Sequence, residues 1–451
     1  MTDLDRHFAA HTRTLCSRYD RALEHAHLDG VVIHAGSLRY RFQDDNPYPF
    51  AANPNFVQWA PLTAHPDSWI AYAKGTRPKL IVCLPDDYWH QPPSRPEGAW
   101  VNAFDLVVVH TADDAAAALP HDRRHTAFLG EDEGLGVTLG FESINPGQLI
   151  NAIHHVRACK TDYEIACIRE ASRLGTLAHV AARDAFFEGE SEYGIHSAYL
   201  DAIDFTDHDL PYGNIVALNE HGAVLHYQVF DRTPPNDSRS FLIDAGATCR
   251  GYASDITRTY ARSDGEFAAM IAALDERQQQ IVAGCTVGTD YGALHLVAHR
   301  HCAELLDEFG LVTGLSTEDV IETGITRAFF PHGLGHLLGI QVHDVAGFSA
   351  NENGDPIDRP EGHPYLRLTR PLEAGMVTTI EPGLYIIDPL LASLKETAAG
   401  SSVKWDRVEE FRPFGGIRIE DDVLVTDAGP VNLTREAFTA IASVNAPAGR
   451  P

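Results

Sequence analysis

Residues 241–260 constrain the fold of this chain more than any other segment. Two β-rich runs, Phe241–Asp244 and Asp255–Tyr260, flank a turn at Cys249-Arg250-Gly251, which predicts an antiparallel hairpin. If the hairpin is symmetric about that turn, Asp244 and Asp255 lie opposite each other, with Cβ atoms about 5 Å apart. Carboxylates this close repel each other, so they need a shared proton or a pair of cations about 3.5–4 Å apart. Asp is common at solvated strand ends, but the apolar residues before Asp244 argue against solvation.

The composition excludes several kinds of partner. The 451 residues carry 35 Lys+Arg and 63 Asp+Glu, a formal charge of −28, so nucleic acid and anionic membranes would be repelled. No run approaches the roughly 18 apolar residues of a membrane span, and the first residues lack the apolar core of a signal peptide. Seven scattered cysteines fit neither a disulfide framework nor a thiolate metal site. We therefore expect a soluble, cytoplasmic protein.

A domain boundary is predicted near residue 160. Before it, short apolar runs such as 30–34 and 79–84 alternate with helical stretches, which predicts a smaller α/β domain over residues 1–158. The capping box Thr161-Asp-Tyr-Glu164 begins a long helix that ends at Gly189. Beyond it, helices are expected near residues 191–203, 266–284 and 289–309, and strands near 213–218, 240–246, 253–260, 376–381 and 416–426. Short turns between strand pairs indicate an antiparallel sheet, and hence an α+β domain over 159–451.

Two segments are predicted to be loops. Residues 42–59 are rich in proline and aromatic residues, which indicates an extended loop that either serves function or packs on the surface. Residues 390–404, rich in Ala, Ser and Thr, are predicted to form a mobile loop.

A histidine-rich segment is the second candidate for a site. It runs Phe330-Pro-His332-Gly-Leu-Gly-His336 and continues to His343. With 24 histidines in the chain, a pair four residues apart carries little information, and each histidine alone could be a hydrogen-bonded core residue. The two glycines disfavour a helix and allow the backbone to approach another segment closely. Three imidazoles in apolar sequence would leave several polar nitrogens to satisfy.

Two further carboxylates, Glu381 and Glu420, stand at or near the ends of apolar strands. The two-residue period of a strand puts Arg418 and Glu420 on one face. A lone Glu on a strand more often faces solvent. Four carboxylates and one imidazole, however, make an oxygen-rich donor set that suits a pair of Mn²⁺, Co²⁺ or Zn²⁺ ions.

In their order, these segments resemble the pita-bread metallopeptidases, and within them the bacterial Xaa-Pro dipeptidases, or prolidases, which are related to organophosphorus acid anhydrolases. The similarity covers nearly the whole chain and includes Asp44-Asp-Asn-Pro-Tyr-Pro-Phe50, Asn214–Glu220 and Leu225-His-Tyr227. It implies a C-terminal pita-bread catalytic domain with a curved antiparallel sheet over 159–451. The N-terminal α/β domain, 1–158, would mediate dimerisation and carry an active-site loop.

The resemblance also implies the members of the site. Two divalent ions per subunit, Mn²⁺ first with Co²⁺ or Zn²⁺ as alternatives, would be held by Asp244, Asp255, His336, Glu381 and Glu420. A hydroxide bridging the ions would attack the peptide carbonyl, with Glu381 as general base and proton shuttle. The other catalytic residues would be His332 and His343, and substrate would be bound by Tyr212, His226, Arg370, Arg418 and Asp45.

These features together predict a homodimer that hydrolyses Xaa-Pro dipeptides. One alternative is an aminopeptidase that takes longer peptides with proline second, and chain-length preference separates the two. Another is a non-catalytic binding protein on the same scaffold, which should have lost metal ligands. Organophosphate triester hydrolysis is a side activity that the resemblance also implies, because a tetrahedral phosphorus centre resembles the peptide transition state.

Overall fold

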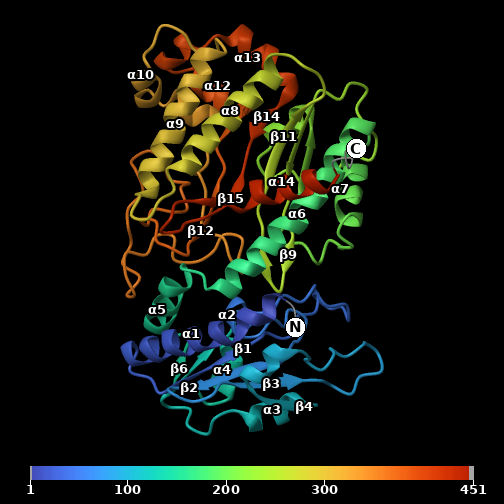
Figure 1. The fold of residues 1–451 in the computed structure, drawn as a ribbon, viewed down its shortest axis with the longest axis vertical. Coiled ribbons are helices and arrows are strands. Elements are labelled where there is room, and N and C mark those ends of the chain that lie inside the picture. The colour runs from blue at the N-terminus through green and yellow to red at the C-terminus, as the bar shows by residue number, and fades with distance from the viewer. Residues whose placement is uncertain (1–2, 446–451) are drawn as a thin grey trace, which may run out of the picture. The chain divides into compact units, whose positions relative to one another are not determined.

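The structure, a computed structural model, describes residues 3–445 and divides into two compact units. The first consists of the chain up to Cys167 with Cys249–Tyr252 and Ser349–Pro356, and the second holds the remainder. In Figure 1 the first unit is drawn mostly in blue to teal and the second in green to red. No helix among the described residues is both long and apolar enough to cross a membrane.

A six-stranded sheet forms the centre of the first unit. Its strand order is β4-β3-β2-β1-β5-β6, in which β1 pairs antiparallel with β2 and parallel with β5. Alternate strand residues, such as Val32 and Phe128, pack into one apolar cluster with residues around α3. The α/β prediction for this region is confirmed. The elements are α1 Asp3–His25, β1 Gly30–His34, α2 Pro54–Trp59, β2 Trp69–Ala73, β3 Lys79–Cys83, η1 Ala99–Ala103, β4 Asp105–Val109, α3 Ala112–Ala118, β5 Thr126–Leu129, α4 Glu133–Thr138, β6 Ser143–Ile144 and α5 Gly147–Arg157.

Part of the segment predicted as a loop over 42–59 is helical. Helix α2 begins after Asn53, whose side chain accepts a hydrogen bond from the Asn55 amide, and Pro54 occupies its first turn. The residues before it contain no helix or strand. A bridge between Tyr40 and Pro47 folds this part back on itself, and Asp45 at its tip is exposed.

The second unit contains a curved antiparallel sheet in two halves. One half has the strand order β11-β8-β7 and the other β12-β15-β16, and all of their pairings are antiparallel, as predicted. A single bridge between Thr257 and Glu420 joins the halves. A second bridge, between Leu337 and Thr378, adds the histidine-rich segment beside β12. The strands are β7 Ile215–Leu218, β8 Ser240–Asp244, β11 Thr257–Ala261, β12 Val377–Ile380, β13 Gly383–Tyr385, β14 Gly416–Arg418, β15 Asp421–Leu424 and β16 Val431–Asn432. The short strands β9 Thr248–Cys249 and β10 Tyr252–Ala253 each have one residue in either unit.

Helices cover this sheet. Helices α6 and α7 pack on β7 and β8 through a core that includes Phe186, Tyr199 and Phe241. Helices α8 and α9 lie side by side, and α8 contacts β11 and β12 (Figure 1). The helices are α6 Asp162–Glu188, α7 Glu192–Asp201, η2 Asn219–Ala223, α8 Glu266–Ala283, α9 Tyr291–Glu308, α10 Thr317–Glu322, α11 Ile325–Phe329, α12 Asp388–Lys395, η3 Ala398–Ser402, α13 Trp405–Phe411, η4 Arg412–Phe414 and α14 Leu433–Asn445.

Two predictions for this unit are wrong. The segment 390–404 is not a loop, because α12 and η3 occupy most of it. Pro389 stands in the first turn of α12, and Leu391 and Leu394 are buried, so one apolar face stabilises the helix despite its bland composition. The strand predicted over 416–426 is two strands, β14 and β15, separated at Ile419 and Glu420.

Burial of His179 on α6 predicts a loss of stability in acid. Nε2 of His179 donates to the carbonyl oxygen of Ala245 at 3.0 Å, and the side chain is fully buried. Burial lowers the pKa of His179 to about 4, whereas the unfolded chain binds the proton near pH 6.5. The stabilisation is therefore complete above about pH 6.5 and decreases as the pH falls, by about 2 kcal/mol at about pH 5.

His179→Gln keeps a donor but does not titrate. We expect this variant to show a smaller drop in melting temperature between neutral and mildly acidic buffer than the unsubstituted protein. His208→Gln, at an exposed position, is the matched control and should leave the drop unchanged. An equal drop in all three proteins would contradict the assignment.

Candidate metal centre

The hairpin around residue 250 has a different register from the predicted one. Strand β11 pairs with β8 so that Thr257, not Asp255, lies opposite Asp244. The reason is the turn: Arg250 and Gly251 both have positive φ, 52° and 86°, so the hairpin turns between these two residues. The predicted pairing of Asp244 with Asp255 would instead place its centre between Cys249 and Arg250. Because the shift is two residues, Asp255 still shares a face with Thr257 and with Asp244.

Strand pairing places the side chains of further donors on the same face of the sheet as Asp244 and Asp255. Glu420 lies opposite Thr257 through their bridge. The pairing of Ile380 with Asp421 then places Glu381 opposite Glu420. The histidine-rich segment continues the sheet, because the Thr379 amide donates to the His336 carbonyl oxygen at 3.0 Å. The side chains of all five predicted metal ligands consequently project from one face.

Gly335 allows the histidine-rich segment to approach β12. A Cβ atom at this position would lie 2.2 Å from the Thr379 carbonyl oxygen and 2.3 Å from the Tyr291 hydroxyl. At Gly333 a Cβ atom would lie 2.9 Å from the Leu366 Cα atom. The close backbone approach predicted from these glycines is confirmed.

The five donors converge in space. One ligand atom from each of Asp255, His336 and Glu420 lies within 4.8 Å of the others, and all three side chains are buried. Nε2 of His336 is 3.7 Å from Oε1 of Glu381. Asp244 joins the group through the Tyr212 hydroxyl, which lies 2.8 Å from Oδ1 of Asp244 and 2.5 Å from Oδ1 of Asp255 and shares its one proton between them.

Hydrogen bonds hold several donors in orientation. Nδ1 of His336 donates to the Leu337 carbonyl oxygen at 3.0 Å, which directs Nε2 toward the carboxylates. The Thr257 hydroxyl donates to Oε2 of Glu420 at 2.6 Å. Nη2 of Arg418 donates to Oδ2 of Asp244 at 2.7 Å. The set is preorganised before any ion binds.

The site carries an excess of negative charge. Burial, followed by repulsion from neighbouring carboxylates, raises the pKa of Glu420 well above its ordinary value, and burial raises the pKa of Glu381 to about 7. Burial lowers the pKa of His336, but Asp255 and Glu381 outweigh it and raise the value to about 8. These groups therefore hold protons where divalent cations would relieve the repulsion. Oxygen-rich donors with one imidazole fit such ions.

Besides Tyr212 and Arg418, the predicted catalytic residues His332 and His343 also lie next to these donors. Nδ1 of His332 is 3.7 Å from Oε2 of Glu381, and the ring centroids of His343 and His336 are 4.4 Å apart. The Tyr385 hydroxyl bonds to Nε2 of His332 and accepts from Nη1 of Arg418, both at 2.8 Å.

The three remaining predicted binding residues lie in three different parts of the structure. Arg370 is buried, and its Nε donates to Oε1 of Glu373 at 2.9 Å. His226 is exposed on the segment after η2, and it lies close enough to His332 and His343 to add to the effect of burial in lowering their pKa values. Asp45 is exposed in the first unit.

Sequence analysis missed residues that support the donors. Thr257 contacts Glu420 directly, whereas Tyr385 contacts His332 and Arg418. Asp421 and Asp422 lie beside Glu420 in the chain. Oδ1 of Asp422 accepts from the Asp255 amide at 3.2 Å. The consecutive carboxylates Glu420-Asp-Asp422 in an apolar strand were the available signal, but a sequence does not show on which side each one points.

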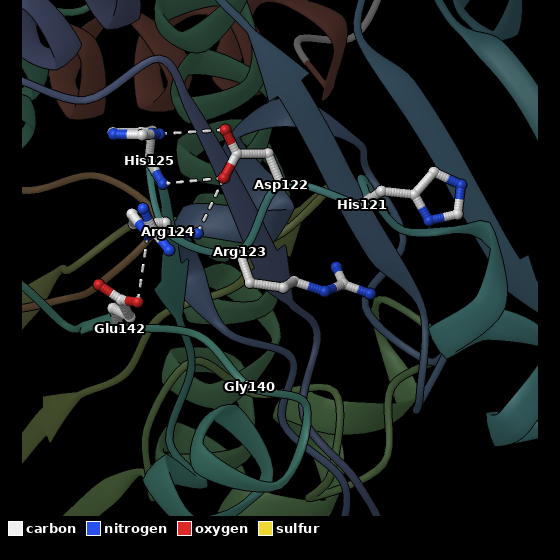
Figure 2. A pocket seen from close by; sticks show the side chains of 7 residues that line it. All are labelled: His121, Asp122, Arg123, Arg124, His125, Gly140 and Glu142. Atoms are coloured by element: carbon white, nitrogen blue, oxygen red, sulfur yellow. Dashed lines mark hydrogen bonds and ion pairs between the residues drawn. The ribbon is translucent and has the colours of Figure 1, made fainter.

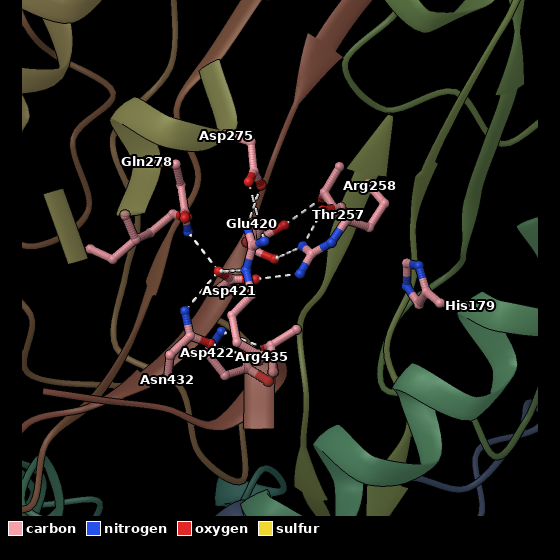
Figure 3. A network of polar contacts seen from close by, with 12 residues as sticks. His179, Thr257, Arg258, Asp275, Gln278, Glu420, Asp421, Asp422, Asn432 and Arg435 are labelled. Carbon is pink, nitrogen blue, oxygen red and sulfur yellow. Dashed lines mark hydrogen bonds and ion pairs between the residues drawn. The ribbon is translucent and has the colours of Figure 1, made fainter. Parts of the chain in front are cut away.

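Asp421 is the centre of a buried polar network (Figure 3). Its carboxylate accepts from Arg258 at 2.6 Å and from Arg435 at 2.8 Å, and the amides of Gln278 and Asn432 also donate to it. Burial opposes ionisation, but the two guanidinium groups outweigh it and lower the pKa of Asp421 to about 2. This ionised group anchors β15, the strand that begins directly after Glu420.

A hollow in the first unit is less suited to chemistry (Figure 2). Its lining includes Asp122, whose oxygens already accept from the amide and ring of His125, and Arg124, which pairs with Glu142 at 3.5 Å. The guanidinium of Arg123 lies over the Phe141 ring, 4.7 Å from its centroid. These partners are those of an ordinary surface turn.

Comparison with known proteins agrees with this geometry. Residues 166–427 match the profile of metallopeptidase family M24, and residues 6–155 match that of the Xaa-Pro dipeptidase N-terminal domain. The chain belongs to metallopeptidase family M24. It is 51% identical to a Xaa-Pro dipeptidase of Stenotrophomonas maltophilia (strain K279a), over 96% of this chain and 97% of that protein. It is 50% identical to one of Xanthomonas axonopodis pv. citri (strain 306), over 96% and 98%.

Solved structures share the fold. An aminopeptidase P variant from Escherichia coli superposes with a TM-score of 0.71 at 21% identity, covering 98% of this chain and 99% of that one. Pseudomonas aeruginosa aminopeptidase PepP gives a TM-score of 0.70 at 23% identity, with 95% and 98% covered. The pita-bread α+β fold predicted from sequence is confirmed.

The Asp421 network predicts a large effect of a small substitution. Asp421→Asn would leave Arg258 and Arg435 without their shared anion, and we expect the free energy of unfolding to fall by about 3–5 kcal/mol. Urea unfolding in the presence of a chelator measures this without a contribution from bound metal. Asp427→Asn, at an exposed position, should change it by no more than about 0.5 kcal/mol. Equal midpoints for the two variants would show that the network contributes little.

Proposed function

We propose that this protein is a dinuclear metallopeptidase that hydrolyses Xaa-Pro dipeptides. The observation that carries the proposal is the convergence of five metal-binding side chains on one face of the sheet. A non-catalytic relative is not favoured, because none of these donors is missing. The relatives at about half identity are named Xaa-Pro dipeptidases, which favours a dipeptidase over an aminopeptidase.

Five residues are proposed to hold two divalent ions: Asp244, Asp255, His336, Glu381 and Glu420. When bound, such ions lower the pKa of a water molecule, so that a nucleophile is available at neutral pH, and polarise the scissile carbonyl. The predominance of carboxylate oxygen favours Mn²⁺, with Co²⁺ or Zn²⁺ as alternatives because of the single imidazole.

Glu381 is proposed as the general base. It would take the proton from the attacking water and pass it to the prolyl nitrogen, which cannot leave without one. Its position suits a shuttle, because its oxygens lie 3.7 Å from both His332 and His336. Burial lowers the pKa of His332 to about 3, so this imidazole is neutral and does not repel cations. His332 and His343 would contact the tetrahedral oxyanion or the proline ring.

Substrate binding is proposed to involve Tyr212, His226, Arg370 and Arg418. Tyr212 and Arg418 already hold Asp244, so they would position the substrate and the ligands together. Arg370 is assigned the substrate carboxylate. Glu373 contacts the Nε and Nη2 atoms of Arg370, which fixes the orientation of the planar guanidinium group.

Residues 1–158 are proposed to mediate homodimerisation and residues 159–451 to form the catalytic domain. In the dimer, exposed Asp45 would reach the substrate amino group in the partner's site. A cytoplasmic location is also proposed. Its support is that the seven cysteines, all within the described residues, are thiols rather than disulfides, as expected in a reducing compartment.

Removal of one proposed ligand carboxylate tests the proposal. Glu420→Gln or Asp255→Asn should abolish hydrolysis of Gly-Pro and Leu-Pro and should release at least one metal ion per chain, measured by elemental analysis. Glu396→Gln, at an exposed position, is the matched control for the loss of one negative charge. Normal hydrolysis with full metal content in Glu420→Gln would refute the assignment.

The carboxylate clamp predicts a preference for free acids. Wild-type kcat/KM should be much higher for Xaa-Pro than for Xaa-Pro-amide. Arg370→Ala should erase most of that difference, at a cost of about 2–4 kcal/mol, or roughly 30- to 1000-fold. Arg300→Ala, which removes an exposed arginine, should leave the preference intact. Equal cleavage of acid and amide by the wild type would instead favour the aminopeptidase alternative.

A further inference from the structure

A second group of potential metal ligands lies in the same unit, separate from the five residues described above. His295 and His299 are one turn apart on α9 and therefore share a helix face. His363 comes from the segment before β12. All three are buried, and one ring nitrogen from each lies within 4.8 Å of one from each of the others. Their ring centroids are 4.4–4.7 Å apart.

The hydrogen bonds of this histidine cluster are incomplete. Nε2 of His295 and Nδ1 of His363 are 2.9 Å apart, and Nδ1 of His299 is 3.0 Å from the Thr326 hydroxyl. Among the described residues, nothing bonds to Nδ1 of His295 or to Nε2 of His299, although both atoms are buried. An unsatisfied buried nitrogen is costly, so two in one cluster call for a ligand.

The charge state of the cluster suits coordination. Burial lowers the pKa of His295 to about 3 and that of His299 to about 2, and burial also lowers the pKa of His363. At neutral pH the three rings are therefore uncharged, and each offers a nitrogen lone pair. Three neutral imidazoles with an open fourth position are a recurrent zinc-binding set.

Space for an ion is present. The three rings line a cavity of about 200 Å³ together with Arg327, Phe330 and His332. Tetrahedral Zn²⁺ with bonds of about 2.0–2.1 Å places its nitrogens roughly 3.3 Å apart. One ring nitrogen from each histidine already lies within 4.8 Å of the others, so small movements of the rings would bring them to this spacing. The cavity lining contains no Asp or Glu among the described residues. The positive charge of Arg327 would favour an anion as the fourth ligand of the ion.

A further group of potential ligands differs from the histidine cluster, because its hydrogen bonds are complete at the buried carboxylate. Glu192, His221 and Asp231 also come together, but the Glu192 carboxylate is fully used. Its Oε1 accepts from the Leu218 amide and from His221, and its Oε2 accepts from Tyr227 and from the Asp231 amide, at 2.7–2.9 Å. The Glu192 carboxylate therefore already accepts four hydrogen bonds, and none of the buried unsatisfied atoms among the described residues belongs to this group.

We propose that His295, His299 and His363 form a mononuclear zinc site, separate from the dinuclear centre. The two sites are close neighbours. The Phe330 ring packs on His299 and on His332, with centroid distances of 4.8 Å in both cases. An ion held by the histidine cluster would fix Phe330 and thereby restrict His332 beside the proposed base.

Zinc content measures the third ion directly. The full-length protein, loaded with excess Zn²⁺ and passed through gel filtration, should retain three zinc ions per chain. His299→Leu, which keeps the volume of the side chain, should retain two. His301→Gln, on the same helix but outside the cluster, is the matched control and should retain three. His363→Asn, in the loop, provides an independent variant if substitution within α9 impairs folding.

The test separates this site from the proposed catalytic centre. Glu420→Gln should lose ions from the dinuclear centre and still keep the zinc that His299→Leu removes. Co²⁺ substituted for zinc should show visible absorption typical of tetrahedral nitrogen coordination, which the His299→Leu difference spectrum isolates. An unchanged zinc content in both His299→Leu and His363→Asn, or wild-type protein that retains no zinc attributable to these residues, would overturn the proposal.

Discussion

Four carboxylates and one imidazole project from the same face of a curved sheet, and their mutual repulsion is the constraint that the surrounding structure has to satisfy. Burial strengthens that repulsion, because little water is present to screen the charges. Burial raises the pKa values of Glu381 and Glu420, and repulsion from the neighbouring carboxylates adds to this effect. A site of this kind is stable either with bound protons or with cations, and divalent ions satisfy it at neutral pH.

The fold limits the cost of this arrangement by providing donors around it. Tyr212, Thr257 and Arg418 each donate to a carboxylate of the site. Asp421, the residue after Glu420, is ionised in the company of two guanidinium groups. Carboxyl groups that are neighbours in the chain thus meet opposite environments. The surroundings of Glu420 suit a cation, whereas the ion pairs of Asp421 hold β15 in place beside it.

The histidine cluster has the opposite electrostatic character: it is uncharged, whereas the carboxylate site carries negative charge. Its three rings are neutral because burial disfavours the charged imidazolium, and no carboxylate stands beside them in the cavity. The dinuclear centre presents charge that requires cations, whereas the cluster presents lone pairs that require a partner. Phe330 packs between the cluster and His332, so the two kinds of site are adjacent in one unit.

Local patterns in the sequence were sufficient to predict the antiparallel sheet and the four helices α6 to α9. They also indicated an oxygen-rich set of four carboxylates and one imidazole as the candidate ligands. Two-residue periodicity also identified the face that Arg418 shares with Glu420. Only the tertiary structure decided the hairpin register, because it depends on positive φ at Arg250 and Gly251. It also decided which distant segments meet: Thr257 with Glu420, and His295 with His363, 68 residues away. Such contacts arise from strand pairing and packing, which spacing along the chain does not encode.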